Sequence, residues 1–392
     1  MRKTIIIPGS KSLTNRALIM ASLANGQSTI KNHSKSKDSK VLVRTLRKLG
    51  IKIIEKNDQL IITGNEGKFK SFNGILDVGE AGTALRFLTS LIILIPGRVV
   101  FHGSKRLMKR PIGELKEALK KVKTGEVSIK GDTSSQFISS LLMIAPVLDK
   151  DLVINITGRR ISNSYIDMTI DLMKKFGVKV KKINSSKFII KKQSYKSINY
   201  IVETDLSGAS YFFAVAAITG KAIKVKNINF NSPQGDLLFP NLLKKMGCQV
   251  RKNIRERSLE VIGPKILKGI NADMINMPDT AQTLSVVAAF ARGNTKITGL
   301  STLKLKETDR LLALKKELNK MKIKSVVTDD SIMIVGGKPK KAIINTYGDH
   351  RMAMAFAVAK SSIPELIIKN PEVVKKSFPE FWKIFNNLTS SF

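Results

Sequence analysis

The sequence predicts an α/β protein of two domains, built from repeated units of helices and strands. Its 392 residues exceed the size at which a single hydrophobic core is usual. Apolar helical segments rich in Ala and Ser recur along the whole chain, and short strand patterns follow several of them. Such recurrence is typical of a fold assembled from one supersecondary motif.

Six apolar helices form the first part of these repeats. They are apolar on nearly all sides, which predicts burial in a core. An amphipathic helix opens 26 to 31 residues after each of them. The apolar helices begin at Asn15, Gly82, Ser134, Gly208, Thr280 and His350, and the amphipathic helices near Val41, Pro111, Tyr165, Asp236, Asp309 and Pro379. We therefore expect six βαβαββ-type repeats, three in each domain.

Hairpins complete most of the repeats. Four amphipathic helices end in the related phrases LRKLGI, MKKFGV, LKKMGC and LNKMKI, and a Gly after a basic last turn predicts a helix stop. The segment Ile51–Gly64 then indicates a strand, an Asn-Asp turn and a second strand.

The second repeat lacks a hairpin. Its apolar helix starts 52 residues before the next one, whereas the other intervals are 67 to 74 residues. Between Lys123 and Ser134 only one strand, Glu126–Lys130, is expected to remain. Loss of a hairpin exposes a sheet edge or part of a helix face, so we expect this domain to be the less stable of the two.

Composition narrows the classes of partner. Lys and Arg number 68 against 30 Asp and Glu, a net charge of +38 that predicts anionic partners. The basic residues are scattered with few aromatics between them, which favours small phosphorylated or carboxylated substrates over nucleic acid. One Cys and three His without metal-ligand spacing predict no disulfide and no metal site, and fit a reducing cytoplasm.

Membrane association is not expected. The most apolar run, Phe87–Ile95, is too short to span a bilayer. A strand pattern, Thr4–Ile7, follows the first three residues, so no cleavable leader or transit segment is expected and the protein should be cytoplasmic.

Polar residues collect where the apolar helices begin. Pro8–Arg16, Gly79–Arg86 and Gly131–Gln136 place Gly, Ser, Thr, Lys and Arg at the first three, and TDLSGAS, MPDTAQT and YGDHR open the others. Helix N-termini attract phosphate and carboxylate groups. Any one of these segments is also explained as an ordinary N-cap, but all six together predict a site for more than one anion. The phosphate-loop pattern of nucleotide-binding proteins is absent.

Three groups of charged residues are candidates for chemistry. Lys306, Glu307 and Arg310 are expected within one helical turn, with Asp309 as a cap or Arg partner, and the alternative is a solvated charge ladder. Asp279 stands at a helix start, where its local sequence fits a cap and a base equally well. The Asp349-His350-Arg351 segment opens another helix, although a lone His is more often structural.

These motifs resemble those of the EPSP synthase family, in the family's order and over essentially the whole chain. They are PGSKSLTNR, GEAGTALR, RPI (110–112), SSQF, SNSYID (162–167), PDTAQT, KETDR, GDHRMAMA and KSFP (376–379). The resemblance implies two inside-out α/β domains, residues 10–203 and residues 1–9 with 204–392. It also implies an active site in the interdomain cleft.

The resemblance further implies a reaction. Family members transfer the enolpyruvyl group of phosphoenolpyruvate to the 5-hydroxyl of shikimate 3-phosphate, through a tetrahedral intermediate with release of phosphate. This step belongs to the shikimate pathway and to aromatic amino acid biosynthesis. No metal or organic cofactor is implied, and we expect a monomer.

The site residues carried over from the family fall into three groups. Asp279 is implied as acceptor of the 5-hydroxyl proton, and Glu307 and Lys11 as candidates for protonating the methylene carbon and the leaving phosphate. The shikimate 3-phosphate ligands implied are Lys11, Ser12, Arg16, Ser134, Ser135, Gln136, Ser162, Tyr165, Asp279 and Lys306. The phosphoenolpyruvate ligands implied are Lys11, Gly82, Thr83, Arg110, Gln136, Arg310, His350, Arg351 and Lys376.

Two positions depart from the family pattern, and two other functions compete. Glu80 and Thr302 each replace a common Asn, and Glu80 puts a carboxylate beside an expected phosphate site.

One alternative function is that of the transferase that loads enolpyruvyl onto UDP-N-acetylglucosamine. Most members of that group carry a loop Cys, whereas Cys248 is expected to be a packed thiol. The other is a non-catalytic basic module that binds RNA.

Overall fold

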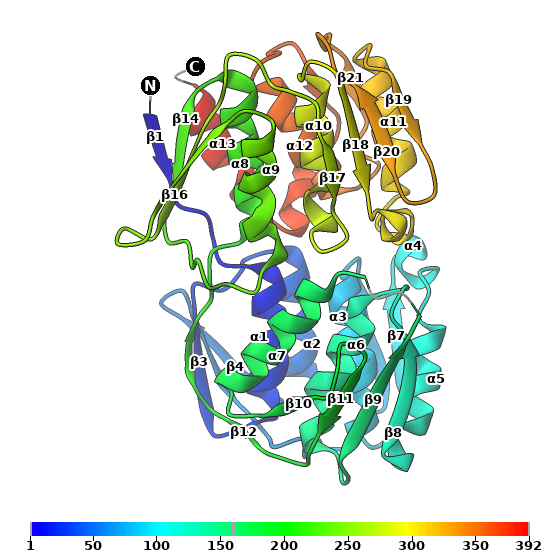
Figure 1. Cartoon of the computed structure of the whole chain (residues 1–392). Helices are drawn as coiled ribbons and strands as arrows, with labels where there is room; N and C mark the ends of the chain where they lie inside the picture. Colours follow the sequence, from blue (N-terminus) through cyan, green and yellow to red (C-terminus); the bar gives the residue numbers. More distant parts are fainter. Residues whose placement is uncertain (1, 159–160, 391–392) are drawn as a thin grey trace. The chain divides into compact units, whose positions relative to one another are not determined.

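The chain forms two compact units in the computed structural model, which describes residues 2–158 and 161–390 (Figure 1). Unit 1 combines Met1–Pro8 with Glu203–Phe392, and unit 2 spans Gly9–Val202. Both divisions lie one residue before the positions expected from the sequence. Each unit has its own hydrophobic core.

Three central helices form the core of unit 2. Helix α3 packs on α6, α6 on α7, and α1 on α2 and α7. The helices of this unit are α1 (Lys11–Leu23), α2 (Lys37–Lys48), α3 (Gly82–Leu91), α4 (Lys105–Met108), α5 (Gly113–Lys121), α6 (Ser135–Ile144) and α7 (Asn163–Lys175). Nearly every residue of α1, α3 and α6 is buried, Ser and Thr included, as their apolar, small-residue sequences predict.

Two four-stranded sheets of unit 2 share one topology. In each, a strand pairs in parallel with a second strand, which pairs antiparallel with the last strand of a hairpin. The first sheet has the order β13 (Asn199–Ile201), β3 (Gln27–Lys31), β5 (Gln59–Thr63), β4 (Lys52–Lys56), and the second β8 (Glu126–Lys130), β9 (Leu152–Thr157), β11 (Lys187–Ile190), β10 (Val180–Lys182). A short pair, β2 (Ala24–Asn25) and β12 (Tyr195–Lys196), completes the strand pairing near α1.

A third sheet of unit 2 has two strands, β6 (Gly74–Gly79) and β7 (Val99–Gly103). The prediction that Glu126–Lys130 is a remnant of its hairpin is wrong, because this strand pairs in parallel with β9 and opens the next sheet. After α5 a short 3-10 turn and Gly125, at φ 86°, redirect the chain straight into β8. The whole hairpin is therefore missing after α5.

Unit 1 repeats the same sheet order. Its sheets are β1 (Arg2–Ile5), β14 (Ala222–Val225), β16 (Ser258–Ile262), β15 (Gln249–Asn253); then β17 (Asn271–Asp273), β18 (Asn294–Thr298), β20 (Ile332–Val335), β19 (Ser325–Val327); and the pair β21 (Ile343–Ile344), β22 (Ile367–Ile368). The N-terminal strand β1 thus serves a sheet whose other strands lie more than 200 residues later in the chain.

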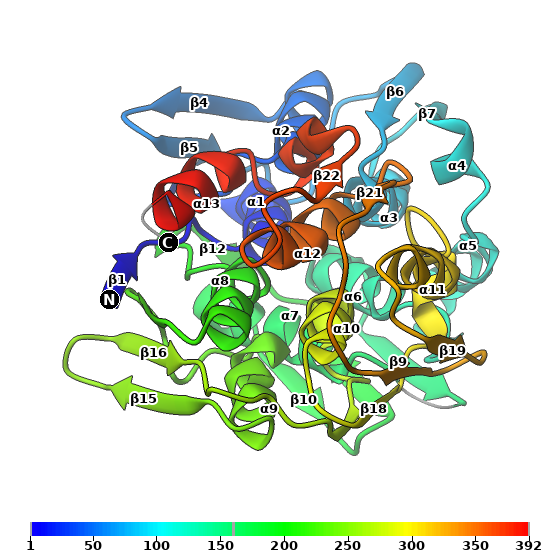
Figure 2. The ribbon, with the colours of Figure 1, turned by 90° about the horizontal axis from the view of Figure 1, so that it is seen from above.

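Three buried helices pack against one another in unit 1, as both ribbon views show (Figures 1 and 2). They are α8 (Leu206–Thr219), α10 (Ala281–Ala289) and α12 (His350–Lys360); the other helices are α9 (Phe239–Lys245), α11 (Arg310–Lys320) and α13 (Phe381–Thr389). Among the described residues, no helix is long and apolar enough to cross a membrane.

Some helix boundaries differ from those expected. Helix α1 begins at Lys11, four residues before Asn15, so Lys11 lies in its first turn. Helix α11 begins at Arg310, with Asp309 as N-cap. The prediction that Lys306 and Glu307 share a helical turn with Arg310 is therefore wrong, since both precede the helix. The Asp309 carboxylate accepts a hydrogen bond from the Leu312 amide at 3.1 Å, which favours a start after Asp309.

Candidate active site

The N-terminus of α1 carries the first group of expected site residues. Ser10 caps the helix, and its hydroxyl accepts a hydrogen bond from the Leu13 amide. The Lys11 ammonium lies 3.0 Å from the carboxylate of Asp38, and both side chains are largely buried. Ser12 is partly buried beside Lys11. An ammonium held at a helix start suits an anionic group of a substrate.

Arg16 lies one turn further on and is 1% exposed. Its guanidinium donates to the Thr169 hydroxyl at 2.7 Å, the Ser12 carbonyl at 2.9 Å, the Ser139 hydroxyl at 3.2 Å and the Tyr165 carbonyl at 3.1 Å. Burial lowers the pKa of Arg16 to about 10, so it stays protonated at neutral pH. Arg16 thus fastens α1 to α6 and α7. This geometry favours a positioning role, while its contact with a substrate stays a prediction.

Two guanidinium groups converge on the start of α3. A Cβ added to Gly82 would lie 2.8 Å from an Nη1 atom of Arg86 and 2.8 Å from that of Arg110. The Arg86 guanidinium also donates to the Gly82 carbonyl at 2.9 Å and lies over the Phe137 ring. Glycine at this position therefore leaves room for two cations beside a helix N-terminus. The sequence placed Arg86 with Gly82 in the polar group at this helix start, but only Gly82 and Arg110 were assigned as ligands.

The start of α6 contributes hydroxyl and amide groups. Ser134 is the N-cap, and its hydroxyl accepts from the Gln136 amide. The side-chain amide of Gln136 donates to the Thr83 hydroxyl at 3.3 Å, which links the starts of α6 and α3. The side-chain oxygen of Gln136 is buried and lacks a hydrogen-bond partner among the described residues. The neighbouring Ser135 is buried in the first turn.

Ser162 and Tyr165 lie at the start of α7. Ser162 has a left-handed backbone, with φ 54° and ψ 45°. A non-glycine residue in this region is strained, and such strain often occurs at functional sites. The Tyr165 ring lies against the Arg16 guanidinium. Apart from Arg110, which lies between α4 and α5, the expected ligands of unit 2 therefore lie near the N-termini of four helices, α1, α3, α6 and α7.

Unit 1 contributes a different arrangement, centred on Arg310. This guanidinium is buried and donates to Asp349 at 2.7 Å, to Glu307 at 3.0 Å and to Asp279 at 3.4 Å. Burial alone would lower the pKa of Arg310, but the carboxylates of Asp349, Glu307 and Asp279 outweigh it and raise that pKa above its ordinary value. One fixed cation therefore orients three carboxylates.

Asp279 is held by a second arginine. The Arg351 guanidinium donates to the Asp279 carboxylate at 2.8 Å and to its backbone carbonyl at 3.1 Å. The N-cap of α10 is Thr280, and no side-chain capping bond forms there. The sequence left cap and base open for Asp279, and these contacts favour a positioned carboxylate. Its side chain is 17% exposed, so it is partly accessible to a substrate.

Glu307 and its neighbours complete this group. The Glu307 side chain is 18% exposed and lies 3.9 Å from the ammonium of Lys376, which is nearly buried at the end of a 3-10 turn. Lys306 precedes it in extended backbone. His350 is 2% exposed, and its ring nitrogen Nδ1 lies 3.8 Å from Asp349.

Two acidic residues of unit 1 were not assigned from the sequence. Asp349 is fully buried and is the N-cap of α12, where its carboxylate accepts a hydrogen bond from the Arg351 amide at 2.8 Å. The same carboxylate accepts a hydrogen bond from the Arg310 guanidinium. Its position at a helix start, before a His-Arg pair, was the only sequence signal. Asp236 is buried behind Thr280, where burial raises its pKa to about 7. It accepts hydrogen bonds from the hydroxyls of Ser207 and Thr280, and no local pattern indicated this.

The remaining expectations concern single positions. Glu80 is exposed in the turn before α3, and Thr302 is buried in a 3-10 turn before Lys306. Cys248 is buried, and burial raises the pKa of its thiol to about 12, as expected of a packed thiol rather than a reactive one. Among the described residues, no group of three or more His, Cys, Asp or Glu side chains is placed to hold a metal ion.

These features are typical of an α/β enzyme that acts on small anionic substrates, because polar and cationic groups stand at helix N-termini and carboxylates are held by buried arginines. The sequence and fold are also similar to those of known proteins, which identify the family. The model of EPSP synthase (3-phosphoshikimate 1-carboxyvinyltransferase) matches residues 1–124 and 120–385. The chain belongs to this family.

Curated relatives extend over the whole chain. It is 38% identical to a 3-phosphoshikimate 1-carboxyvinyltransferase of Nostoc punctiforme, over 97% of this chain and 95% of the relative. Identity to the protein of the same name from Methanosphaerula palustris is also 38%, over 96% and 94%. The fold is similar to that of an EPSP synthase from Acinetobacter baumannii, with a TM-score of 0.79, 23% identity and coverage of 99% and 95%.

Proposed function

We propose that this enzyme transfers the enolpyruvyl group of phosphoenolpyruvate to the 5-hydroxyl of shikimate 3-phosphate, with release of phosphate. Family membership and the names of the full-length relatives support this assignment. The observation that carries it is the pair of carboxylates, Asp279 and Glu307, bound to one buried guanidinium, Arg310. Addition of a hydroxyl to an enol phosphate, followed by elimination of phosphate, requires a base and an acid that stay fixed through two steps.

The cations of both units supply the charge that the substrates need. The two substrates carry two phosphates and two carboxylates, and charge-assisted hydrogen bonds from Lys and Arg are the strongest match for such groups. We assign the anions to Lys11, Arg110, Arg351 and Lys376, with Gln136 as an amide ligand. The remaining sequence-assigned ligands keep their proposed roles: Ser12, Arg16, Gly82, Thr83, Ser134, Ser135, Ser162, Tyr165, Lys306, Arg310 and His350.

The proton transfers fall to three residues. In the first step, the oxygen of the 5-hydroxyl bonds to the central carbon of phosphoenolpyruvate, and Asp279 takes the proton of that hydroxyl. The methylene carbon of phosphoenolpyruvate receives a proton in the same step. In the second step that methyl group loses a proton, the bond to the phosphate oxygen breaks, and phosphate leaves. Glu307 and Lys11 are the proposed donors to carbon and to phosphate. Variants of Glu307 and Lys11 would distinguish the donor to carbon from the donor to phosphate.

A two-substrate assay tests the proposal. Phosphate release should require both phosphoenolpyruvate and shikimate 3-phosphate, and Asp279→Asn should reduce kcat by about 10²–10⁴-fold. The matched control is Asp329→Asn, which removes an exposed carboxylate of the same unit. Absence of release with both substrates saturating would contradict the assignment, and release with UDP-N-acetylglucosamine as acceptor would favour the sister transferase.

A second pair of variants tests the contribution of Lys11. Lys11→Ala should raise KM for both substrates and lower kcat, whereas Lys244→Ala, at an exposed site on α9, should leave both unchanged. We also propose that the enzyme acts in the cytoplasm as a monomer. The high net positive charge, which disfavours self-association, supports the monomer.

A further inference from the structure

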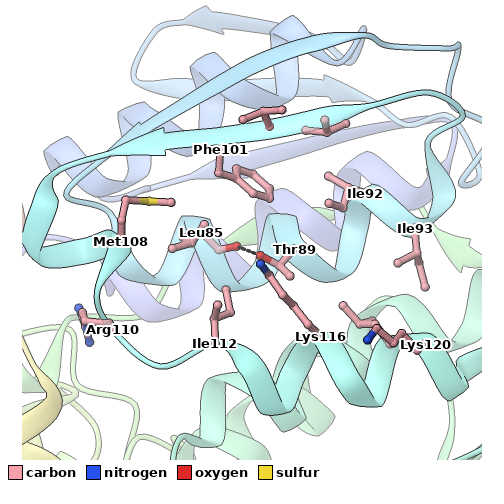
Figure 3. A pocket seen from close by; sticks show the side chains of 13 residues that line it. Leu85, Thr89, Ile92, Ile93, Phe101, Met108, Arg110, Ile112, Lys116 and Lys120 are labelled. Atoms are coloured by element: carbon pink, nitrogen blue, oxygen red, sulfur yellow. Dashed lines mark hydrogen bonds between the residues drawn. The ribbon is translucent and has the colours of Figure 1, made fainter.

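A groove lies beside β7 in unit 2, where the hairpin is missing. We call it the β7 groove; its volume is about 600 Å³, and it is lined by β7, α3 and α5 (Figure 3). Leu85, Thr89 and Ile92 of the α3 segment form one wall, and Ile112 and Leu119 of the α5 segment form the other. Phe101 of β7 points into the space between them (Figure 3).

The other sheets show what normally occupies this position. In the four four-stranded sheets of the described residues, the strand equivalent to β7 pairs antiparallel with the last strand of a hairpin, whereas the parallel pair β21–β22 has two strands as β6–β7 does. Among the described residues, β7 pairs with β6 alone, so the corresponding edge carries no strand. The family model also breaks near this point, matching residues 1–124 and 120–385 as two segments. The chain has therefore lost the strand and kept the surface that it covered.

The lining of the groove is apolar with a basic rim. Ile93 is 40% exposed, Val100 45% and Met108 46%, high values for such large apolar side chains. The charged residues that line the groove are Arg110, Lys116 and Lys120, all basic. Exposed apolar surface beside an open strand edge is a common feature of protein interaction sites.

We propose that the β7 groove binds an extended acidic segment of a partner protein, which adds to β7 as an antiparallel strand. Alternate apolar side chains of the segment would fill the groove, and acidic side chains between them would meet Lys116 and Lys120. A second copy of this chain is a poorer occupant, because its own charge of +38 repels the rim. Strand addition of this kind derives affinity from the backbone and specificity from alternate side chains. The proposal goes beyond the transferase reaction and does not depend on it.

Peptide binding to the full chain tests this inference. The probe is a labelled, terminally blocked peptide of about seven residues in which Val and Glu alternate, the length of an ordinary strand. Fluorescence anisotropy at low salt should show saturable binding. The same peptide with Lys in place of Glu should bind at least tenfold more weakly. Hydrogen exchange should show new protection of the β7 amides, residues 99–103, when the acidic peptide binds.

Variants of the exposed surface separate groove binding from general charge attraction. The double change Lys116→Glu and Lys120→Glu should weaken the acidic peptide at least tenfold. The matched double change Lys244→Glu and Lys245→Glu, on exposed positions of α9, should have a much smaller effect. Ile93→Glu provides a second groove variant, and circular dichroism checks that each variant folds.

Three outcomes would overturn the proposal. One is no saturable binding up to about 1 mM peptide, the range of the weakest specific complexes. Another is equal loss of affinity in the groove and α9 variants, which would indicate nonspecific attraction. The third is concentration-dependent dimerisation by sedimentation that Ile93→Glu abolishes, which would make a second copy the occupant.

Discussion

The two units hold their charged residues in different ways. In unit 1, buried arginines form hydrogen-bonded ion pairs with carboxylates, and Arg310 contacts three of them, Asp279, Glu307 and Asp349. In unit 2, cations stand at the starts of helices, with Lys11 in the first turn of α1 and the guanidinium groups of Arg86 and Arg110 beside Gly82 of α3. Pairing with carboxylates fixes acid and base groups in place, whereas cations at helix N-termini attract anions. The carboxylates of unit 1 are therefore positioned in a way that suits proton transfer, and the helix starts of unit 2 suit the binding of anions.

The largest effect is expected from breaking the unit 1 network. Arg310→Lys keeps the positive charge, but the lysine ammonium lacks the planar set of N–H donors with which the guanidinium contacts three carboxylates. We expect kcat to fall by about 10²–10⁴-fold, as for loss of a positioned acid or base, with a smaller change in KM. Steady-state phosphate release measures both constants. A pure rise in KM would instead limit Arg310 to its proposed role as an anion ligand and remove the contrast between the units.

The next effect concerns pH and the stability of unit 1. Because the pKa of Asp236 is raised from 3.8 to about 7 in the folded state, its contribution to stability is full below pH 4 and is lost as pH rises towards 7. The parent should lose about 1–4 kcal/mol of unfolding free energy between pH 5 and pH 8 through ionisation of Asp236. Asp236→Asn should remove this loss, because the amide does not ionise. Urea unfolding at the two pH values measures it. An identical pH dependence in parent and variant would mean that Asp236 is not protonated in the fold.

A comparable change in stability is expected in unit 2 from Arg16→Lys. Lysine cannot replace the three hydrogen bonds by which Arg16 joins α1 to α6 and α7, and the loss should cost about 2–3 kcal/mol. Hydrogen exchange of α1 and α7 measures this without interference from unit 1. If protection stays constant while KM for shikimate 3-phosphate rises, Arg16 is a substrate ligand rather than a positioning residue.

The smallest expected change comes from Gly82→Ala. Its methyl group must displace the ends of the Arg86 and Arg110 side chains, each 2.8 Å away. We expect KM for phosphoenolpyruvate to rise about tenfold, equivalent to about 1.4 kcal/mol, with kcat nearly unchanged. Gly113→Ala is the matched control, because nothing lies within 4 Å of its added Cβ. An effect on kcat alone would place Gly82 outside anion binding.

Local sequence predicted the helices well where one pattern dominated. The apolar helices beginning at Gly82 and His350 start at those residues, because a run of small apolar residues after polar capping residues leaves few alternatives. The start of α1 was placed four residues late, since Lys11 and Ser12 are polar although they lie in the helix. Strand Glu126–Lys130 was found but given the wrong sheet, because pairing depends on distant residues.

The family, the repeated helices and the candidate site residues could be predicted without a structure, because motif order and the residues at helix starts are local properties of the chain. Tertiary structure alone decided that Asp349 and Arg310, 39 residues apart, form a buried ion pair. The missing hairpin was predicted from the repeat spacing, but only the structure showed that β7 carries the open edge and that burial raises the pKa of Asp236. The physical reason is that burial, and the contacts that satisfy buried charges, arise only when segments far apart in the chain are packed together.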